Sequence, residues 1–316
     1  MSVSEMILVV LALGFAWSMG AHYTGACMGM PHATGSIRLW PALWLMAPLT
    51  LLGASLLSHR VLYNIGHGIL VVHRLGTLPA IAILAAAFML TTIFTQRRIP
   101  TSTIQILVFA IIGAGLEQGL TIRWSLVLRL AGLWVSAPFI AFILGYVLTK
   151  CFDLVPQFVS SGSTGMIGRC LVLIGGAASL AMGANDVSNA TAVFLTTGIT
   201  GDLLAGAVGG IGLAAGVLTW GRPLLERVAF DVVKVDMAMA TAAQLVQALV
   251  VLTAVLAGYF TSMNQALIGA MAGAGFARGR ETIDQRVVGA VLRGWVVGPL
   301  AGMTLGFSFC WLLQRI

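Results

Sequence analysis

The chain has 316 residues, of which 59% are hydrophobic and only 9% are charged, and its formal net charge is +7. Soluble domains carry about 25% charged residues, so this chain cannot cover a water-facing surface of its size. The composition therefore excludes a soluble enzyme, a nucleic-acid-binding domain and a disordered chain. It predicts an all-α polytopic membrane protein that is surrounded by the lipid bilayer.

Apolar segments follow one another along the chain in two sets of five. The first set lies at about 7–19, 39–57, 78–95, 104–116 and 126–149. The second set lies at about 171–195, 203–220, 237–260, 265–277 and 287–313. A complete crossing takes about 20 residues, so 7–19 and 104–116 are short, which is typical of discontinuous or re-entrant helices around a transport site. We expect 7–19 to be retained as a first helix, because no basic region of a signal peptide precedes it.

Motifs of the first set recur in the second set, in the same order and at a nearly constant spacing. The Met-Gly-Ala motif at 19–21 recurs at 182–184, the Thr-Ser motif at 101–102 recurs at 261–262, and the Trp-Val motif at 134–135 recurs at 295–296. An ordered series of this kind indicates an internal duplication. We predict a first transmembrane repeat at 1–152, a linker at 153–168 and a second transmembrane repeat at 169–316.

The number of crossings decides how the two repeats are related. Five crossings per repeat is an odd number, so the second repeat is predicted to be inverted relative to the first. The short segments could instead form re-entrant hairpins. With five crossings, and with the loop of Arg97 and Arg98 in the cytoplasm, eleven basic residues lie inside and four outside, in keeping with the positive-inside rule. The four are Arg60, Arg74, Arg123 and Arg315. Both termini are then expected outside, in the cell membrane.

The strongest candidate site is the octapeptide from Gly183 to Ala190, which reads Gly-Ala-Asn-Asp-Val-Ser-Asn-Ala. Asp186 is the only charge in the apolar run around it, and a carboxylate at a helix centre in the membrane costs roughly 2.5–3.5 kcal/mol unless it is compensated. Asn185 and Asn189 are four residues apart and share one helix face. We hypothesise that Asn185, Asp186 and Asn189 supply oxygen ligands to a hard cation. The alternative is hydrogen bonding between helices.

A second candidate site is formed by the paired motifs Thr101-Ser102 and Thr261-Ser262. Each precedes a short apolar helix, where Ser and Thr act as N-caps. The N-terminus of a helix is an anion site, and inverted symmetry would bring two such ends to one compact anion. Simple capping is the alternative interpretation.

These motifs together resemble those of the inorganic phosphate transporter (PiT) family, which includes a sulfate-permease branch. The octapeptide is similar to the family signature GANDVANA, and the Thr-Ser motifs with their Gly-Ala-Gly-x-x-x-Gly continuations look like its second element. The resemblance implies a secondary symporter, not an enzyme, with no cofactor other than the coupling ion. It would carry an inorganic tetrahedral oxyanion, with phosphate as the first choice, driven by Na⁺ or H⁺ through alternating access. A homodimer is a candidate assembly.

The resemblance also assigns site residues and leaves alternatives open. Substrate would be bound by Asn185, Asp186, Asn189, Thr101, Ser102, Thr261 and Ser262, and the coupling ion by Asn185, Asp186, Asn189 and His22. A proton-coupled sulfate permease is the first alternative, and a passive anion channel is the second.

The first-repeat counterpart of the octapeptide departs from the family. His22 and Ala26 stand where the signature has Asn, and Tyr23 stands where phosphate carriers usually have Asp. Gln105 and Gln265 stand where many members carry His. Half of the expected cation ligands are therefore missing, and the less acidic site fits the sulfate branch. His22 is a candidate for proton coupling, and a neutral histidine that is hydrogen-bonded within the bundle is the other interpretation.

Overall fold

The computed structural model describes residues 2–62, 69–72, 75–155, 164–231, 235–279 and 285–315. In these ranges the chain is helical, and its only β feature is an isolated bridge between Leu70 and Ile122. The helices of the first half are α1 (Val3–His22), α2 (Thr24–Ala33), α3 (Leu39–Leu56), α5 (Thr77–Gln96), α6 (Thr103–Glu117) and α7 (Trp124–Asp153). Those of the second half are α9 (Thr164–Thr197), α10 (Asp202–Trp220), α11 (Arg222–Phe230), α12 (Met237–Leu256), α13 (Met263–Arg278) and α14 (Gln285–Leu313).

Eight helices in the described ranges are long and apolar enough to span a membrane, counting α1 and α2 as one span. Large apolar side chains such as Leu128, Leu173 and Leu203 are exposed. Such a surface suits contact with lipid tails and not with water. The prediction of an all-α multi-pass membrane protein is thus confirmed.

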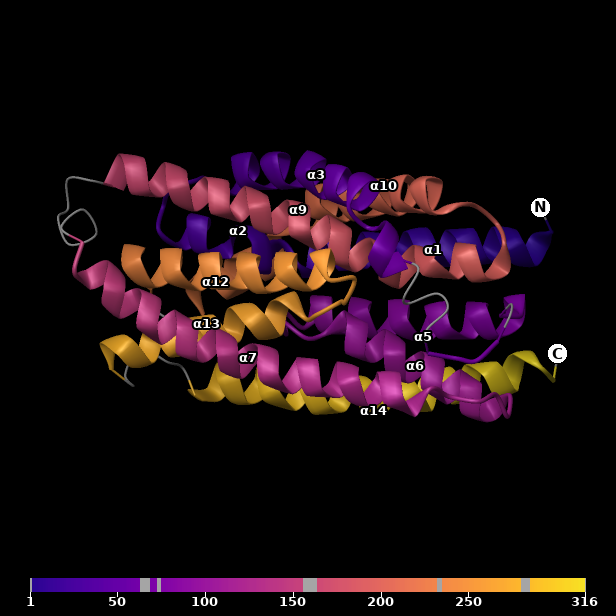
Figure 1. Cartoon of the computed structure of the whole chain (residues 1–316). Coiled ribbons are helices and arrows are strands. Elements are labelled where there is room, and N and C mark those ends of the chain that lie inside the picture. The colour runs from indigo at the N-terminus through magenta and orange to yellow at the C-terminus, as the bar shows by residue number, and fades with distance from the viewer. Residues whose placement is uncertain are drawn as a thin grey trace.

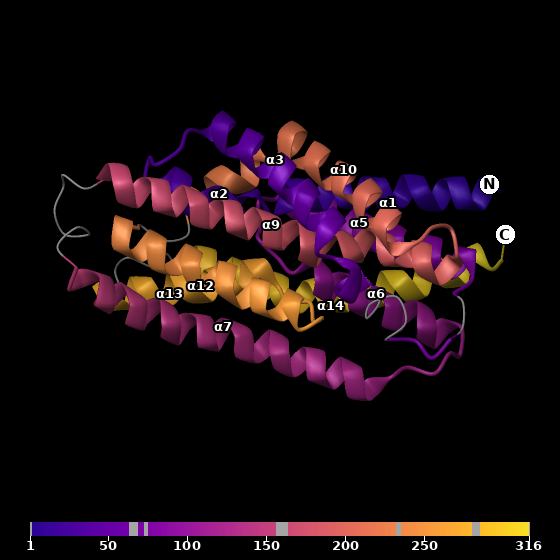
Figure 2. The same cartoon turned by 45° about the horizontal axis from the view of Figure 1, so that its top comes forward.

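The two halves have inverted topology, as predicted. The N- and C-termini lie at the same end of the bundle, and α5 and α6 both occupy the half of the bundle near that end (Figure 1). The equivalent helices α12 and α13 occupy the opposite half (Figures 1 and 2). Each of these pairs is therefore a re-entrant hairpin that begins and ends on one side of the bundle.

The hairpins correct the count of five crossings per repeat. The first half contributes α1 with α2, then α3, then the α5–α6 hairpin, then α7, so three spans and one hairpin replace five crossings. Three is also odd, so the inversion is unaffected. Arg97 caps the C-terminal end of α5, and Arg98 follows it with a positive φ of 54°. Both therefore lie at a hairpin tip within the bundle, and their assignment to a cytoplasmic loop is wrong.

The two repeats are interleaved. The first helix of each repeat packs on the second helix of the other, so α1 contacts α10 and α9 contacts α3. The hairpin helices likewise pack across repeats, α6 against α14 and α13 against α7. Neither repeat thus has a separate core.

The linker predicted at 153–168 includes residues 156–163, which lie outside the described residues. The helix α9 begins at Thr164, before the predicted start of the second repeat at 169.

Candidate functional site

The hairpin tips place two helix N-termini in the middle of the bundle. Ser102 is the N-cap of α6, and its hydroxyl accepts a hydrogen bond from the Gln105 N–H at 3.4 Å. Ser262 caps α13 in the same way, and its hydroxyl accepts from the Gln265 N–H at 3.4 Å. Both serines are completely buried. Two positive helix ends with buried hydroxyls therefore lie at membrane depth, which is the arrangement that favours anions.

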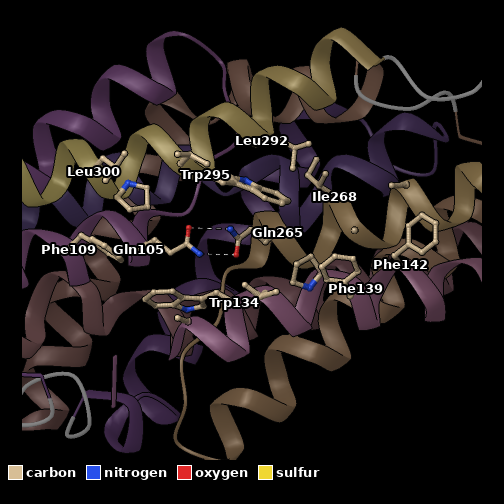
Figure 3. A pocket seen from close by; sticks show the side chains of 17 residues that line it. Gln105, Phe109, Trp134, Phe139, Phe142, Gln265, Ile268, Leu292, Trp295 and Leu300 are labelled. Atoms are coloured by element: carbon tan, nitrogen blue, oxygen red, sulfur yellow. Dashed lines mark hydrogen bonds between the residues drawn. The ribbon is translucent and has the colours of Figure 1, made fainter. Parts of the chain in front are cut away.

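The two tips contact each other through residues from both repeats. The side-chain amides of Gln105 and Gln265 exchange two hydrogen bonds of 3.2 Å, as Figure 3 shows. The Asn264 amide donates to the Thr101 carbonyl at 2.8 Å. The Thr-Ser motifs that the sequence singled out are thus brought together. Gln105 and Gln265 were noted only as departures from the family, and their contact follows from their equivalent positions.

Each tip is also held by the first helix of its own repeat, α1 or α9. The Asn185 amide donates to the Thr261 carbonyl at 3.0 Å, and its oxygen accepts from the Thr261 N–H at 3.1 Å. The equivalent residue of the first repeat is His22, whose Nε2 accepts from the Thr101 N–H at 3.1 Å. Different side chains in the two repeats therefore hold the same backbone position.

Both ring nitrogens of His22 are in use. Nδ1 lies 2.8 Å from the Thr95 hydroxyl, which itself donates to the Thr91 carbonyl. This network places a proton on Nδ1. Nε2 lies 3.1 Å from the Thr101 N–H, from which a neutral ring accepts, and 3.2 Å from the Thr101 carbonyl, to which a protonated ring donates. The contacts therefore fit both interpretations of His22, and in either the ring holds the tip of the α5–α6 hairpin.

Asp186 is completely buried and takes part in no ion pair within the described ranges. Its carboxylate accepts hydrogen bonds from the amides of Asn185 at 3.1 Å and Asn189 at 3.2 Å. Among the described residues, the side-chain oxygens of Asn189 and Thr261 are buried without a hydrogen-bond partner. Buried oxygens that lack donors are the kind of group that a hard cation satisfies. The octapeptide and the second Thr-Ser motif thus offer one oxygen-rich cluster.

Tyr23 joins this cluster from the other repeat. It occupies the position equivalent to Asp186, 163 residues earlier, and its buried hydroxyl lies 2.7 Å from the Thr103 hydroxyl. The same hydroxyl interacts with the Asp186 carboxylate. The two equivalent residues therefore meet between the repeats. The sequence flagged Tyr23 as a departure from the family but did not include it, or Thr103, among the site residues.

An apolar cavity of about 770 Å³ lies on one side of the glutamine pair. Its walls come from α6, α7, α13 and α14, and Trp134 and Trp295 flank the two amides (Figure 3). Gln105 and Gln265 are its only lining residues that also contribute to the tip contacts. An apolar wall does not suit an anion, so the polar cluster of Asp186, Tyr23 and the two Thr-Ser motifs is the candidate binding site.

Comparisons with known proteins agree with this arrangement. The profile of the phosphate transporter family matches residues 19–163 and again residues 158–306. A sulfate permease of Bacillus subtilis is 26% identical over 309 residues, which cover 96% of this chain and 86% of the relative. The chloroplastic inorganic phosphate transporter 2-1 of Arabidopsis thaliana is 24% identical over 421 residues, covering 97% and 72%.

A solved structure shares the whole fold. The sodium-dependent phosphate transporter superposes with a TM-score of 0.90 at 21% sequence identity, and all of both chains is covered. Because the family profile matches both halves of the sequence, as the duplication requires, the chain belongs to the phosphate transporter family.

Proposed function

We propose that the chain is a secondary active symporter of an inorganic tetrahedral oxyanion, most directly phosphate, driven by a Na⁺ or H⁺ gradient. The observation that carries this proposal is the meeting of two helix starts, at Ser102 and Ser262, beside the buried carboxylate of Asp186. Such a site provides for an anion and a cation together, which a passive channel does not need. A carrier of this kind is not an enzyme, and its only cofactor is the coupling ion.

The anion is bound by helix ends and hydroxyls in this proposal. Thr101, Ser102, Thr261 and Ser262 lie at the starts of α6 and α13, and all four are buried. None of the residues of the polar cluster carries a positive side chain. The positive helix ends and the coupling cation therefore compensate the charge of the anion. Each ion should bind its own site more tightly when the other ion is already bound.

The coupling cation is bound by Asn185, Asp186 and Asn189. The carboxylate supplies the charge, and the unpartnered oxygens of Asn189 and Thr261 supply further ligands. Na⁺ prefers oxygen ligands of this kind, and a proton on Asp186 would be the alternative coupling ion. His22 is assigned a positioning role, since its two nitrogens are committed to Thr95 and Thr101.

Alternating access follows from the two hairpins. The α5–α6 hairpin closes the site from the end of the bundle that carries the termini, and α12–α13 closes it from the other end. Contacts between the tips, such as Gln105 with Gln265 and Asn264 with Thr101, would part as one side opens. Inverted repeats that exchange such conformations expose a central site to each side in turn.

Phosphate suits the carboxylate because it retains a proton at neutral pH and can donate it to Asp186. Sulfate has no proton to give and is repelled by an ionised carboxylate. Sulfate is nevertheless the second candidate, because Tyr23 places a hydroxyl donor where the other repeat has Asp186. The similarity to a sulfate permease supports this alternative.

Counterflow in proteoliposomes decides between the two anions. Vesicles loaded with unlabelled phosphate should accumulate labelled phosphate transiently, and excess sulfate should compete poorly. The reverse ranking would make sulfate the substrate. The absence of counterflow with either anion would overturn the proposed function.

We also propose that the protein lies in the cell membrane with both termini outside. Labelling of single cysteines introduced at the two ends would test this orientation.

A further inference from the structure

Another cavity, lined in part by arginines, lies at the tip of the α12–α13 hairpin, apart from the polar cluster described above. It has a volume of about 260 Å³. One wall is the tip itself, from Ala257 to Phe260, and the other is the beginning of α7 with Arg123 and Arg129. The cavity thus places two guanidinium groups against the hairpin that carries Ser262.

The positive charge of this cavity is not neutralised by the protein. Arg129 lies in the membrane-spanning helix α7 and is exposed, and a charged side chain in such a helix faces protein or water and not lipid tails. Arg60 adds a third guanidinium nearby, because it donates to the Leu256 carbonyl at 3.0 Å. Within the described ranges, none of these three arginines forms an ion pair. The guanidinium groups therefore make the cavity electropositive.

The cavity also adjoins the candidate site along the chain. Phe260 forms part of its wall and is 2% exposed, and the next two residues are Thr261 and Ser262 at the start of α13. Arg123 directly precedes α7, which begins in the half of the bundle that carries the termini (Figures 1 and 2). An anion that approaches from that end thus meets the arginines before it reaches Ser262.

The tip of the other hairpin is also basic, but through different residues. Arg97 and Arg98 lie on the tip itself and are exposed, and Arg293 precedes Gly294, whose backbone packs on Ile99. At the spacing of 160 residues, Arg97 and Arg98 correspond to Ala257 and Gly258, which carry no charge. The duplication therefore does not explain why both tips are basic. A shared requirement for positive charge at both approaches does explain it.

We propose that the cavity between Arg123, Arg129 and the α12–α13 tip is a vestibule that binds an inorganic tetrahedral oxyanion before it passes to Ser262. This inference rests on the proposed function and adds an access site to it. Charged groups that line a cavity of low dielectric constant raise the local concentration and the association rate of an oppositely charged ligand. The vestibule therefore acts on substrate capture and not on the rate of the conformational cycle.

The double variant Arg123→Gln/Arg129→Gln tests the vestibule, with Arg315→Gln as the matched control. Arg315 lies at the same end of the molecule but is stacked on Trp311 at 3.7 Å, outside the cavity. For uptake from the side of the termini, the double variant should raise the KM about three- to tenfold. Its maximal rate should stay within about twofold of the parent, and the dependence of KM on ionic strength should weaken. KM for transport from the opposite side should not change.

Several outcomes would overturn the vestibule. An unchanged KM, a fall in maximal rate alone, or an equal effect of Arg315→Gln would each do so. Uptake is compared in vesicles of pure phosphatidylcholine and in vesicles that also contain phosphatidylglycerol. An effect of the double variant that appears only with phosphatidylglycerol would assign the arginines to a lipid headgroup. A parent protein without oxyanion uptake would instead overturn the proposed function, so the two failures are distinguishable.

Discussion

Tyr23 and Asp186 occupy equivalent positions in the two repeats and meet between them, yet one is a phenol and the other a carboxylate. His22 and Asn185 are related in the same way, and each holds the backbone of the threonine at its own hairpin tip. The geometry of the site is therefore nearly symmetric, whereas its chemistry is not. Only the second repeat carries the carboxylate and the amides that suit a cation.

In the proposed mechanism, coupling depends most on Asp186. The variant Asp186→Asn keeps the size and the hydrogen-bonding capacity of the side chain but removes its charge. We expect coupled uptake to fall to the background of empty vesicles, while the protein is still inserted and elutes as a single species. Asp231→Asn is the control, because Asp231 pairs with Arg227 on the surface at the end of α11. Near-normal uptake by Asp186→Asn would refute the assigned role.

Asn189 tests whether the coupling ion is Na⁺. The variant Asn189→Ala removes the buried oxygen that lacks a donor, so the Na⁺ concentration for half-maximal uptake should rise on the order of tenfold, or about 1.4 kcal/mol. Ser188→Ala is the control, since the Ser188 hydroxyl bonds only within its own helix, to the Asn185 carbonyl at 2.9 Å. An unchanged response to Na⁺ would exclude Asn189 as a ligand of a coupling Na⁺.

At the scale of helices, close packing across the repeats holds the hairpins in place. Gly113 of α6 and Gly273 of α13 are equivalent residues, and a Cβ on either would lie within 2.0 Å of a backbone carbonyl oxygen. Those oxygens belong to Met303 of α14 and Phe142 of α7. Small residues permit this approach of two membrane helices, so the recurrence of Gly-Ala-Gly in the sequence has a packing reason.

The packing at Gly273 predicts a clear difference between two Gly→Ala variants. Gly273→Ala forces α13 away from α7 and should destabilise the protein by about 1–3 kcal/mol or more, because backbone cannot move aside as a side chain can. Gly132→Ala should be neutral or stabilise by up to about 1 kcal/mol, since a Cβ there meets nothing within 4 Å. Thermal unfolding in detergent compares the two. Equal stabilities would contradict the close contact.

At the scale of the whole molecule, local patterns predicted the duplication, the helix N-caps and the inverted topology correctly. The sequence could not distinguish the re-entrant hairpins from complete crossings. The reason is that α5 is 20 residues long with a mean hydropathy of 2.1, which is typical of a complete crossing. Whether it crosses or returns depends on packing against α14 and α1, which no local pattern contains. The incorrect assignment of Arg97 and Arg98 to a cytoplasmic loop has the same cause.

The contacts between the repeats could not be predicted from the sequence either. Tyr23 with Asp186 and Gln105 with Gln265 meet only because the repeats are inverted and interleaved. Once a duplication is recognised, equivalent polar residues in the middle of the bundle are the natural candidates for such pairs. The octapeptide and the Thr-Ser motifs were found directly, since a lone buried charge and paired N-caps stand out in an apolar chain.

We propose that the two inverted hairpins form one gated site that couples an oxyanion to a cation. Uptake of labelled phosphate and sulfate into proteoliposomes tests it, with an inward Na⁺ gradient, an inward H⁺ gradient, or neither. One of the two anions should accumulate above its external concentration when one of the gradients is present, and only then. Uptake that merely equilibrates under every gradient would show a passive pore and would contradict coupled transport.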